Sequence, residues 1–267
     1  MKKPIKFAVC GDSFAAPVTL EPIAGHVYHE NARYVGQHFS EVMASELGWE
    51  LFPLARGGNS NGAIRLQVET AIAEGADFIW VTDTGHERIE FRADRGKEFD
   101  WRLGVYNIDM RMHGDLSSLN PKFHHNLLNS ETLSNMLPGY REPGDQNRLT
   151  HHLGPDKIDA ILHYWKQLYD SQYKHRQDSW ILSGMITELK LSGIPFLYVG
   201  NEDMFEYPEM SRLISDNVVV GDQLPIWPRT FSGQNDIGSR FHTGVQEQRQ
   251  IASATIKYIK KKGLIDV

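Results

Sequence analysis

The sequence has little of what marks a secreted, membrane-spanning or nucleic-acid-binding protein. Cys10 is the only cysteine in 267 residues, so no internal disulfide can form, and its place in an apolar run predicts a small buried residue rather than a reactive thiol. No apolar run approaches the roughly 20 residues of a membrane-spanning helix, and the N-terminus lacks a signal-peptide core. The net charge of −6 disfavours nucleic acid as a partner. We therefore expect a cytoplasmic or virion-associated protein with neither a membrane nor a nucleic-acid partner.

Signatures of cofactor and metal sites are also missing. The glycine-rich loop at 57–62 lacks the Lys-Ser/Thr ending of a phosphate-binding loop, and the glycines near the first strand do not form a dinucleotide-binding pattern. The 12 histidines include no His-Glu-x-x-His motif, and the adjacent pairs at 124–125 and 151–152 are poorly spaced for a single ion. We expect no cofactor and no metal.

The apolar pattern alternates between strands and helices. Buried strands are predicted over 7–13, 49–54, 77–81, 194–199 and 218–220. Helices are predicted over 34–47, around 64–72, over 156–191 in one or two pieces, and from Thr243 to the C-terminal lysines. Such alternation implies parallel strands with right-handed crossovers. The sequence therefore predicts a three-layer α/β/α sandwich with a flavodoxin-like parallel sheet of about five strands.

Residues 92–155 interrupt this alternation. They are polar, rich in Asn, His, Arg, Gly and Pro, and show no period. A loop of that length is uncommon within a compact domain unless it has a function. We expect one domain over 1–267, with an irregular insertion at about 92–155 that covers the site or makes a subunit contact, which leaves homo-oligomerisation open.

Polar residues follow the predicted strands in a pattern that favours catalysis. Ser13 ends the first strand, Gly57 and Gly58 follow the second, Thr84 follows the third, and His242 precedes the last helix. Parallel strands present their carboxyl ends at one edge of a sheet, where α/β proteins bind ligands. A serine nucleophile needs a base and donors for its oxyanion. Taken alone, however, Ser13 is equally typical of a turn or cap, and the glycines of a tight turn.

In this order the motifs resemble those of the SGNH (GDSL) hydrolases, whose first block matches Gly11-Asp12-Ser13. The resemblance implies Ser13 as nucleophile and His242 as base. It also implies an oxyanion hole made of the Ser13 and Gly58 backbone N–H groups (Gly57 being the alternative to Gly58), with Thr84 in the position of the family's Asn. It spans the sheet core but not 92–155, and the altered third block is similar to that of a divergent, phage-like branch.

The fifth block departs from the family pattern. The family has Asp-x-x-His there, whereas Ser239 stands three residues before His242. Asp222 and Asp236 lie on the same loop. We take Asp236 as the residue that orients the imidazole, because Gly238 gives the intervening chain freedom to fold back.

The resemblance implies a serine esterase that removes a small acyl group from a carbohydrate or another polar alcohol. Its partner would then be a small-molecule or glycan ester. The alternative is a weakly active or inactive module that uses the same crevice to bind a glycan or a partner protein. A further hypothesis pairs Asp12 and Asp83 as the carboxylates of a glycosidase. It is the weaker one, because Asp at a strand end commonly caps or turns the chain.

Overall fold

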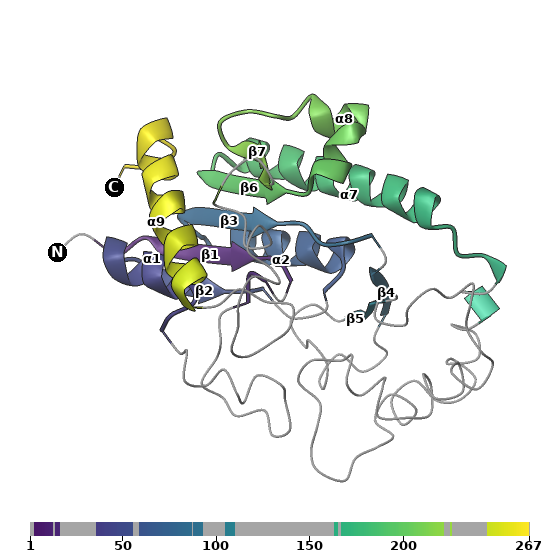
Figure 1. The fold of residues 1–267 in the computed structure, drawn as a ribbon, viewed down its shortest axis with the longest axis horizontal. Coiled ribbons are helices and arrows are strands. Elements are labelled where there is room, and N and C mark those ends of the chain that lie inside the picture. Colours follow the sequence, from purple (N-terminus) through teal and green to yellow (C-terminus); the bar gives the residue numbers. More distant parts are fainter. Residues whose placement is uncertain are drawn as a thin grey trace, which may run out of the picture.

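The computed structural model describes residues 3–12, 14–16, 36–55, 59–86, 88–92, 105–109, 163–164, 167–221, 225 and 245–266 (Figure 1). Strands occur in the order β1 (Lys6–Cys10), β2 (Glu50–Pro53), β3 (Phe78–Thr82), β4 (Arg88–Arg92), β5 (Val105–Asp109), β6 (Phe196–Gly200) and β7 (Val218–Val220). The helices are α1 (Phe39–Leu47), α2 (Asn61–Ala73), α7 (Ser171–Ser192), η4 (Glu202–Glu206), α8 (Pro208–Ser211) and α9 (Val245–Lys262).

The central sheet has five parallel strands in the order β2-β1-β3-β6-β7. This is the flavodoxin-like order that the sequence predicts, so the expected fold class is confirmed. After β1 the chain moves outward to β2 and then crosses back to β3, so the winding direction reverses between β1 and β3. The carboxyl ends of β1 and β3 therefore form the switch point of the sheet, the usual position of a ligand crevice.

Helices cover both faces of the sheet. α1 packs against α9, and α2 packs against α7 (Figure 1). Successive side chains of a strand point to opposite faces. Accordingly Phe7 and Val9 of β1 join the core under α1 and α9, whereas Ala8 and Cys10 join the core under α2 and α7. Two apolar cores and three layers result.

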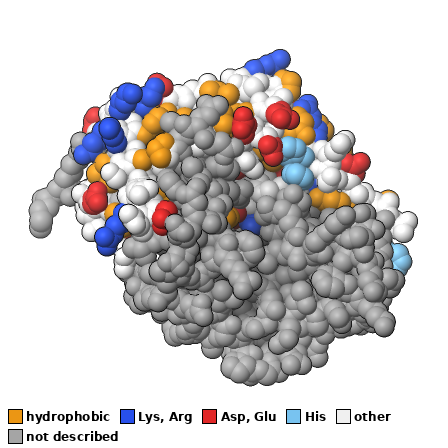
Figure 2. All heavy atoms as spheres, in the orientation of Figure 1, with side chains coloured by type: hydrophobic (Ala, Val, Ile, Leu, Met, Phe, Trp, Pro, Cys, Tyr) orange, Lys and Arg blue, Asp and Glu red, His pale blue; other side chains and the backbone are white. Residues whose placement is uncertain are grey.

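Local signals in the sequence set several element ends. Gly48 ends α1 at a φ of 66°, a left-handed conformation that glycine adopts without steric cost. Pro53 is the last residue of edge strand β2, where a missing N–H costs no ladder bond. Basic side chains gather at the C-terminal end of α9 (Figure 2), where cations complement the helix dipole, as expected for the final lysines.

The structure also differs from the sequence pattern. The strand predicted over 7–13 ends at Cys10, because Gly11 and Asp12 turn the chain. β5 lies inside the segment predicted to be irregular and pairs antiparallel with β4. α7 starts at Ser171 with Asp170 as its N-cap, and Thr243, the predicted start of the last helix, lies outside the described residues. Within the described part of the chain, no helix is long and apolar enough to span a membrane.

Candidate functional site

The chain turns sharply where β1 ends. The backbone oxygen of Asp12 accepts the N–H groups of Ala15 and Ala16 at 3.1 and 3.0 Å, and its Oδ1 accepts the N–H of Phe14 at 2.9 Å. An aspartate that bonds the backbone two residues ahead stabilises a turn. Gly11 is required at its start, because a Cβ there would lie 2.7 Å from Ala15 Cβ at a φ of +152°. The residues on either side of Ser13 are therefore fixed by a direct hydrogen bond.

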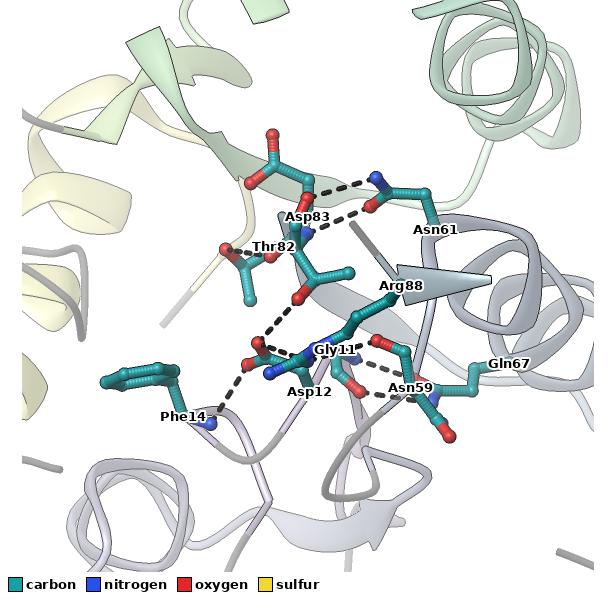
Figure 3. Close-up of polar contacts among 10 residues, drawn as sticks. Gly11, Asp12, Phe14, Asn59, Asn61, Gln67, Thr82, Asp83 and Arg88 are labelled. Carbon is teal, nitrogen blue, oxygen red and sulfur yellow. Dashed lines mark hydrogen bonds and ion pairs between the residues drawn. The ribbon is translucent and has the colours of Figure 1, made fainter. Parts of the chain in front are cut away.

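The second carboxylate oxygen of Asp12 joins this turn to the segment that follows β3 and to β4. Its Oδ2 accepts a hydrogen bond from the hydroxyl of Thr84 at 2.8 Å. It also accepts one from Nη1 of Arg88 at 2.8 Å (Figure 3). Arg88 Nη1 also donates to the backbone oxygen of Asn59 at 3.1 Å. The side chains of Asp12 and Arg88 are 0% and 6% exposed. A buried ion pair of this kind neutralises the aspartate charge beside Ser13.

Two carboxamides of α2 hold the backbone just beyond β1 and β3. Gln67 accepts the Gly11 N–H through Oε1 at 2.6 Å and donates to the Gly11 oxygen through Nε2 at 3.1 Å. Asn61 accepts the Thr84 N–H through Oδ1 at 2.9 Å and donates to the Thr84 oxygen through Nδ2 at 3.0 Å. Both side chains are fully buried, so these bonds replace water that the backbone groups have lost.

Asn61 is held in turn by α7. Its Nδ2 also donates to Oδ2 of Asp178 at 2.9 Å, and the other oxygen of Asp178 pairs with Lys174 one turn earlier on the helix. Asp178 is fully buried and Lys174 is 6% exposed. Polar contacts therefore run without a break from α7 through α2 to the end of β3.

Asp83 fixes the end of β3 to that of β6. Its Oδ2 accepts the hydroxyl of Tyr198 and the N–H of Asn201, each at 2.9 Å. Asp12 and Asp83 are both fully buried and bonded to structural donors. These contacts are those of aspartates that turn and brace strand ends, the interpretation the sequence favours over a pair of glycosidase carboxylates.

Of the residues proposed for catalysis, the described part of the chain contains Thr84. Ser13, Gly57, Gly58, Asp222, Asp236, Ser239 and His242 lie outside it. The proximity of Ser13 and His242 and the choice of Asp236 therefore stay predictions, as does the role of the 92–155 insertion. Thr84 is fully buried and lies at the switch point, but it donates its hydroxyl proton to Asp12. Because a hydroxyl carries one proton, donation to an oxyanion requires this bond to open.

Five residues of this site were not predicted from the sequence: Asn61, Gln67, Arg88, Lys174 and Asp178. A signal exists for Gln67, which lies three residues after Ile64 and four before Ala71, inside the apolar stripe of α2. A polar side chain in such a stripe must find partners in the interior. No comparable signal singles out Arg88, since the apolar pattern of the sequence does not show which way its side chain faces.

Among the described residues, no group of three or more His, Cys, Asp or Glu side chains is arranged to hold a metal ion. Cys10 is buried, as predicted, and burial raises the pKa of its thiol far above the ordinary value. In this strand it behaves as a small apolar residue.

No protein-family model matches the chain, and no curated protein sequence matches it. Among solved structures, the chain is similar to an acetyl xylan esterase, AlAXEase, at 11% sequence identity and a TM-score of 0.45, over 96% of this chain and 100% of that one. So distant a likeness carries no argument about activity. The fold assignment rests instead on the strand order and on the helical layers that cover both faces of the sheet.

Proposed function

We propose that the protein is a serine hydrolase that cleaves a carboxylic ester and removes a small acyl group from a carbohydrate or another polar alcohol. The observation that carries the proposal is the braced Gly11–Asp12 turn at the carboxyl end of β1, next to β3, because Ser13 is the residue that follows this turn in the sequence. Open α/β sheets bind their ligands at this switch point. The motif order that resembles the SGNH hydrolases supports the same conclusion.

In this proposal Ser13 attacks the ester carbonyl while His242 takes its proton, and Asp236 orients the imidazole. The backbone N–H groups of Ser13 and Gly58 stabilise the oxyanion, and Thr84 joins them when its hydroxyl turns away from Asp12. His242 then protonates the leaving alcohol, and water releases the acyl group from Ser13.

The contacts of Asp12 suit this chemistry in two ways. Its hydrogen bonds to the backbone fix the turn before substrate arrives, so less conformational freedom is lost on reaching the transition state. Its charge is paired with Arg88. An unpaired carboxylate beside the nucleophile would oppose the negative charge that develops on the substrate oxygen.

The proposal is tested by labelling with a fluorophosphonate probe and by hydrolysis of p-nitrophenyl acetate. Ser13→Ala should abolish labelling, and Ser13→Ala and His242→Ala should each lower kcat by at least about 10³-fold, as loss of a triad member does. Ser253→Ala, on the exposed side of α9, is the matched control and should behave as wild type. Equal labelling of Ser13→Ala and wild type would overturn the proposal.

One observation favours the second candidate function, a weakly active or inactive module that binds a glycan or a partner protein. Thr84 stands where the resembled family has a third oxyanion donor, yet its proton is held by Asp12. Titration with acetylated and deacetylated oligosaccharides separates the two functions. A module without catalysis binds the acetylated form and leaves it intact after long incubation, whereas the esterase releases acetate.

A further inference from the structure

We propose that Gln67 and Asn61 are positioning residues, which set the backbone beyond the ends of β1 and β3 through Gly11 and Thr84, and that Asp178 fixes the orientation of Asn61. This inference rests on the proposed function for its catalytic consequence, but the geometry of the contacts does not depend on that function. None of these side chains is given a role by the motifs in the sequence.

The two carboxamides bind the backbone groups that lie just beyond the paired part of β1 and β3. The pairing of β1 with β3 ends at Cys10 and Val81, so the backbone groups of Gly11 and Thr84 lie beyond the ladder. Each carboxamide binds both the N–H and the C=O of one of these residues, as a neighbouring strand would. The ends of β1 and β3 are thus satisfied by α2 rather than by each other. The side chains of Asp12 and Thr84 then join the two strand ends at 2.8 Å.

The Asp178 carboxylate and the Thr84 N–H together determine the orientation of the Asn61 carboxamide. A flipped carboxamide would turn its NH₂ group toward the Thr84 N–H and its oxygen toward the carboxylate of Asp178. Both contacts would be repulsive in a fully buried position. Lys174 balances the Asp178 charge, which would otherwise be costly in the interior. α7 therefore determines how Asn61 holds the end of β3.

A positioning role differs from a purely stabilising one in its response to pH in the variant Gln67→Glu. An ionised carboxylate accepts the Gly11 N–H but cannot donate to the Gly11 oxygen, whereas the neutral acid does both. Burial raises the pKa of a carboxyl group at this position. The ratio of variant to wild-type kcat should therefore rise about tenfold as the pH falls from 8 to 5, with KM unchanged.

Two variants serve as controls for that ratio. Gln67→Met keeps the volume but has no group to titrate, so its kcat should be lowered by a factor that is constant with pH. Gln250→Glu places the same charge on the exposed side of α9 and should match wild type at every pH. A ratio for Gln67→Glu that is independent of pH would contradict the positioning role.

Amide hydrogen exchange tests the hydrogen bonds from Gln67 to Gly11 and from Asn61 to Thr84 without an activity assay. In Gln67→Met the Gly11 amide should exchange at least tenfold faster than in wild type, relative to the amide of core residue Leu182. In Asn61→Ala the same should hold for the Thr84 amide. Unchanged exchange at both positions would overturn the inference. If exchange changes as expected but the wild-type protein is never labelled by the fluorophosphonate probe, the positioning of Gly11 and Thr84 by the two carboxamides is supported and the proposed function is contradicted.

Discussion

The Asp12 and Arg88 side chains form an ion pair and are buried, so neither charge can be solvated if the other is removed. Asp12→Asn should therefore lower the free energy of unfolding by about 3–5 kcal/mol, the usual cost of breaking a buried pair. Urea denaturation measures this difference. The double variant Asp12→Asn/Arg88→Met should recover part of the loss, because it leaves no unpaired buried charge. A loss below about 1 kcal/mol in Asp12→Asn would contradict this expectation and show that other groups stabilise the Arg88 charge.

Gly11 and Gly48 both have positive φ angles, but only Gly11 is crowded. A Cβ at Gly11 would lie 2.7 Å from Ala15 Cβ and 2.8 Å from Thr82 Cγ2, whereas one at Gly48 meets nothing within 4 Å. Gly48→Ala should cost about 1 kcal/mol of stability, from backbone strain alone. Gly11→Ala should cost at least about twice as much, because short side chains cannot move aside. Thermal unfolding of both variants checks the order, and the reverse order would contradict the crowding.

Thr84 can be tested through its hydroxyl alone. Thr84→Ser keeps the donor to Asp12, and Thr84→Val removes it at nearly the same volume. If Thr84 also serves the oxyanion, Thr84→Val should lower kcat on p-nitrophenyl acetate about 10²-fold or more, while Thr84→Ser stays within a fewfold of wild type. A Thr84→Val variant that loses stability but keeps its kcat would confine Thr84 to bracing the turn.

At the scale of elements, α1 begins with a capping box. The N–H of His38 is accepted by the Glu41 carboxylate at 3.1 Å, and the Ser40 N–H points to the His38 ring. Burial raises the pKa of Glu41, although backbone N–H groups of residues 36–38 oppose this in part. These backbone bonds favour the ionised carboxylate, but burial outweighs them.

A raised pKa means that the folded state holds the Glu41 proton more tightly than the unfolded chain does. The stability contributed by this group is complete below the ordinary pKa of 4.5 and is lost as the pH rises through the raised value. Glu41→Gln still accepts the His38 N–H but has no proton to lose. Its free energy of unfolding, relative to that of the wild type, should therefore increase as the pH rises from 4 to 7. Urea midpoints across this range measure the trend. A relative stability that does not change with pH would contradict it.

Elements buried on both faces were the most predictable from the sequence. β3 is a continuous apolar run at the centre of the sheet, and Ser60 and Gly48 mark a helix start and a helix end with ordinary cap residues. β5 was not predictable, because a two-stranded sheet separate from the central one needs no continuous apolar run. The polar contacts of the site could not be predicted from the sequence for a different reason. Nothing in the pattern shows that Asn61 of α2 would meet Asp178 of α7, since their contact depends on how the helices pack.

At the scale of the whole molecule, Cys10 reports on global unfolding. It lies in β1 between two other strands, fully buried, and burial raises the pKa of its thiol. The native protein should therefore react with DTNB only through unfolding. Leu182→Ala, in the core under α2 and α7, should destabilise the fold by about 3–5 kcal/mol and accelerate labelling accordingly. Ser253→Ala should not. Reaction of the wild type within seconds in native buffer would contradict this placement.

The polar contacts at the ends of β1 and β3 join segments that are far apart in the order of synthesis. Asp12, Asn61, Gln67, Thr84 and Arg88 all lie within the first 92 residues, whereas Asp178 is made about 90 residues after Arg88. At 5–20 residues per second, a ribosome needs roughly 5–20 s for that interval. During it the amide of Asn61 has no charge to orient it, and the face that α7 later covers is open to water. Any sheet that β1, β2 and β3 form before α7 has been synthesised would therefore expose this face to association with other chains.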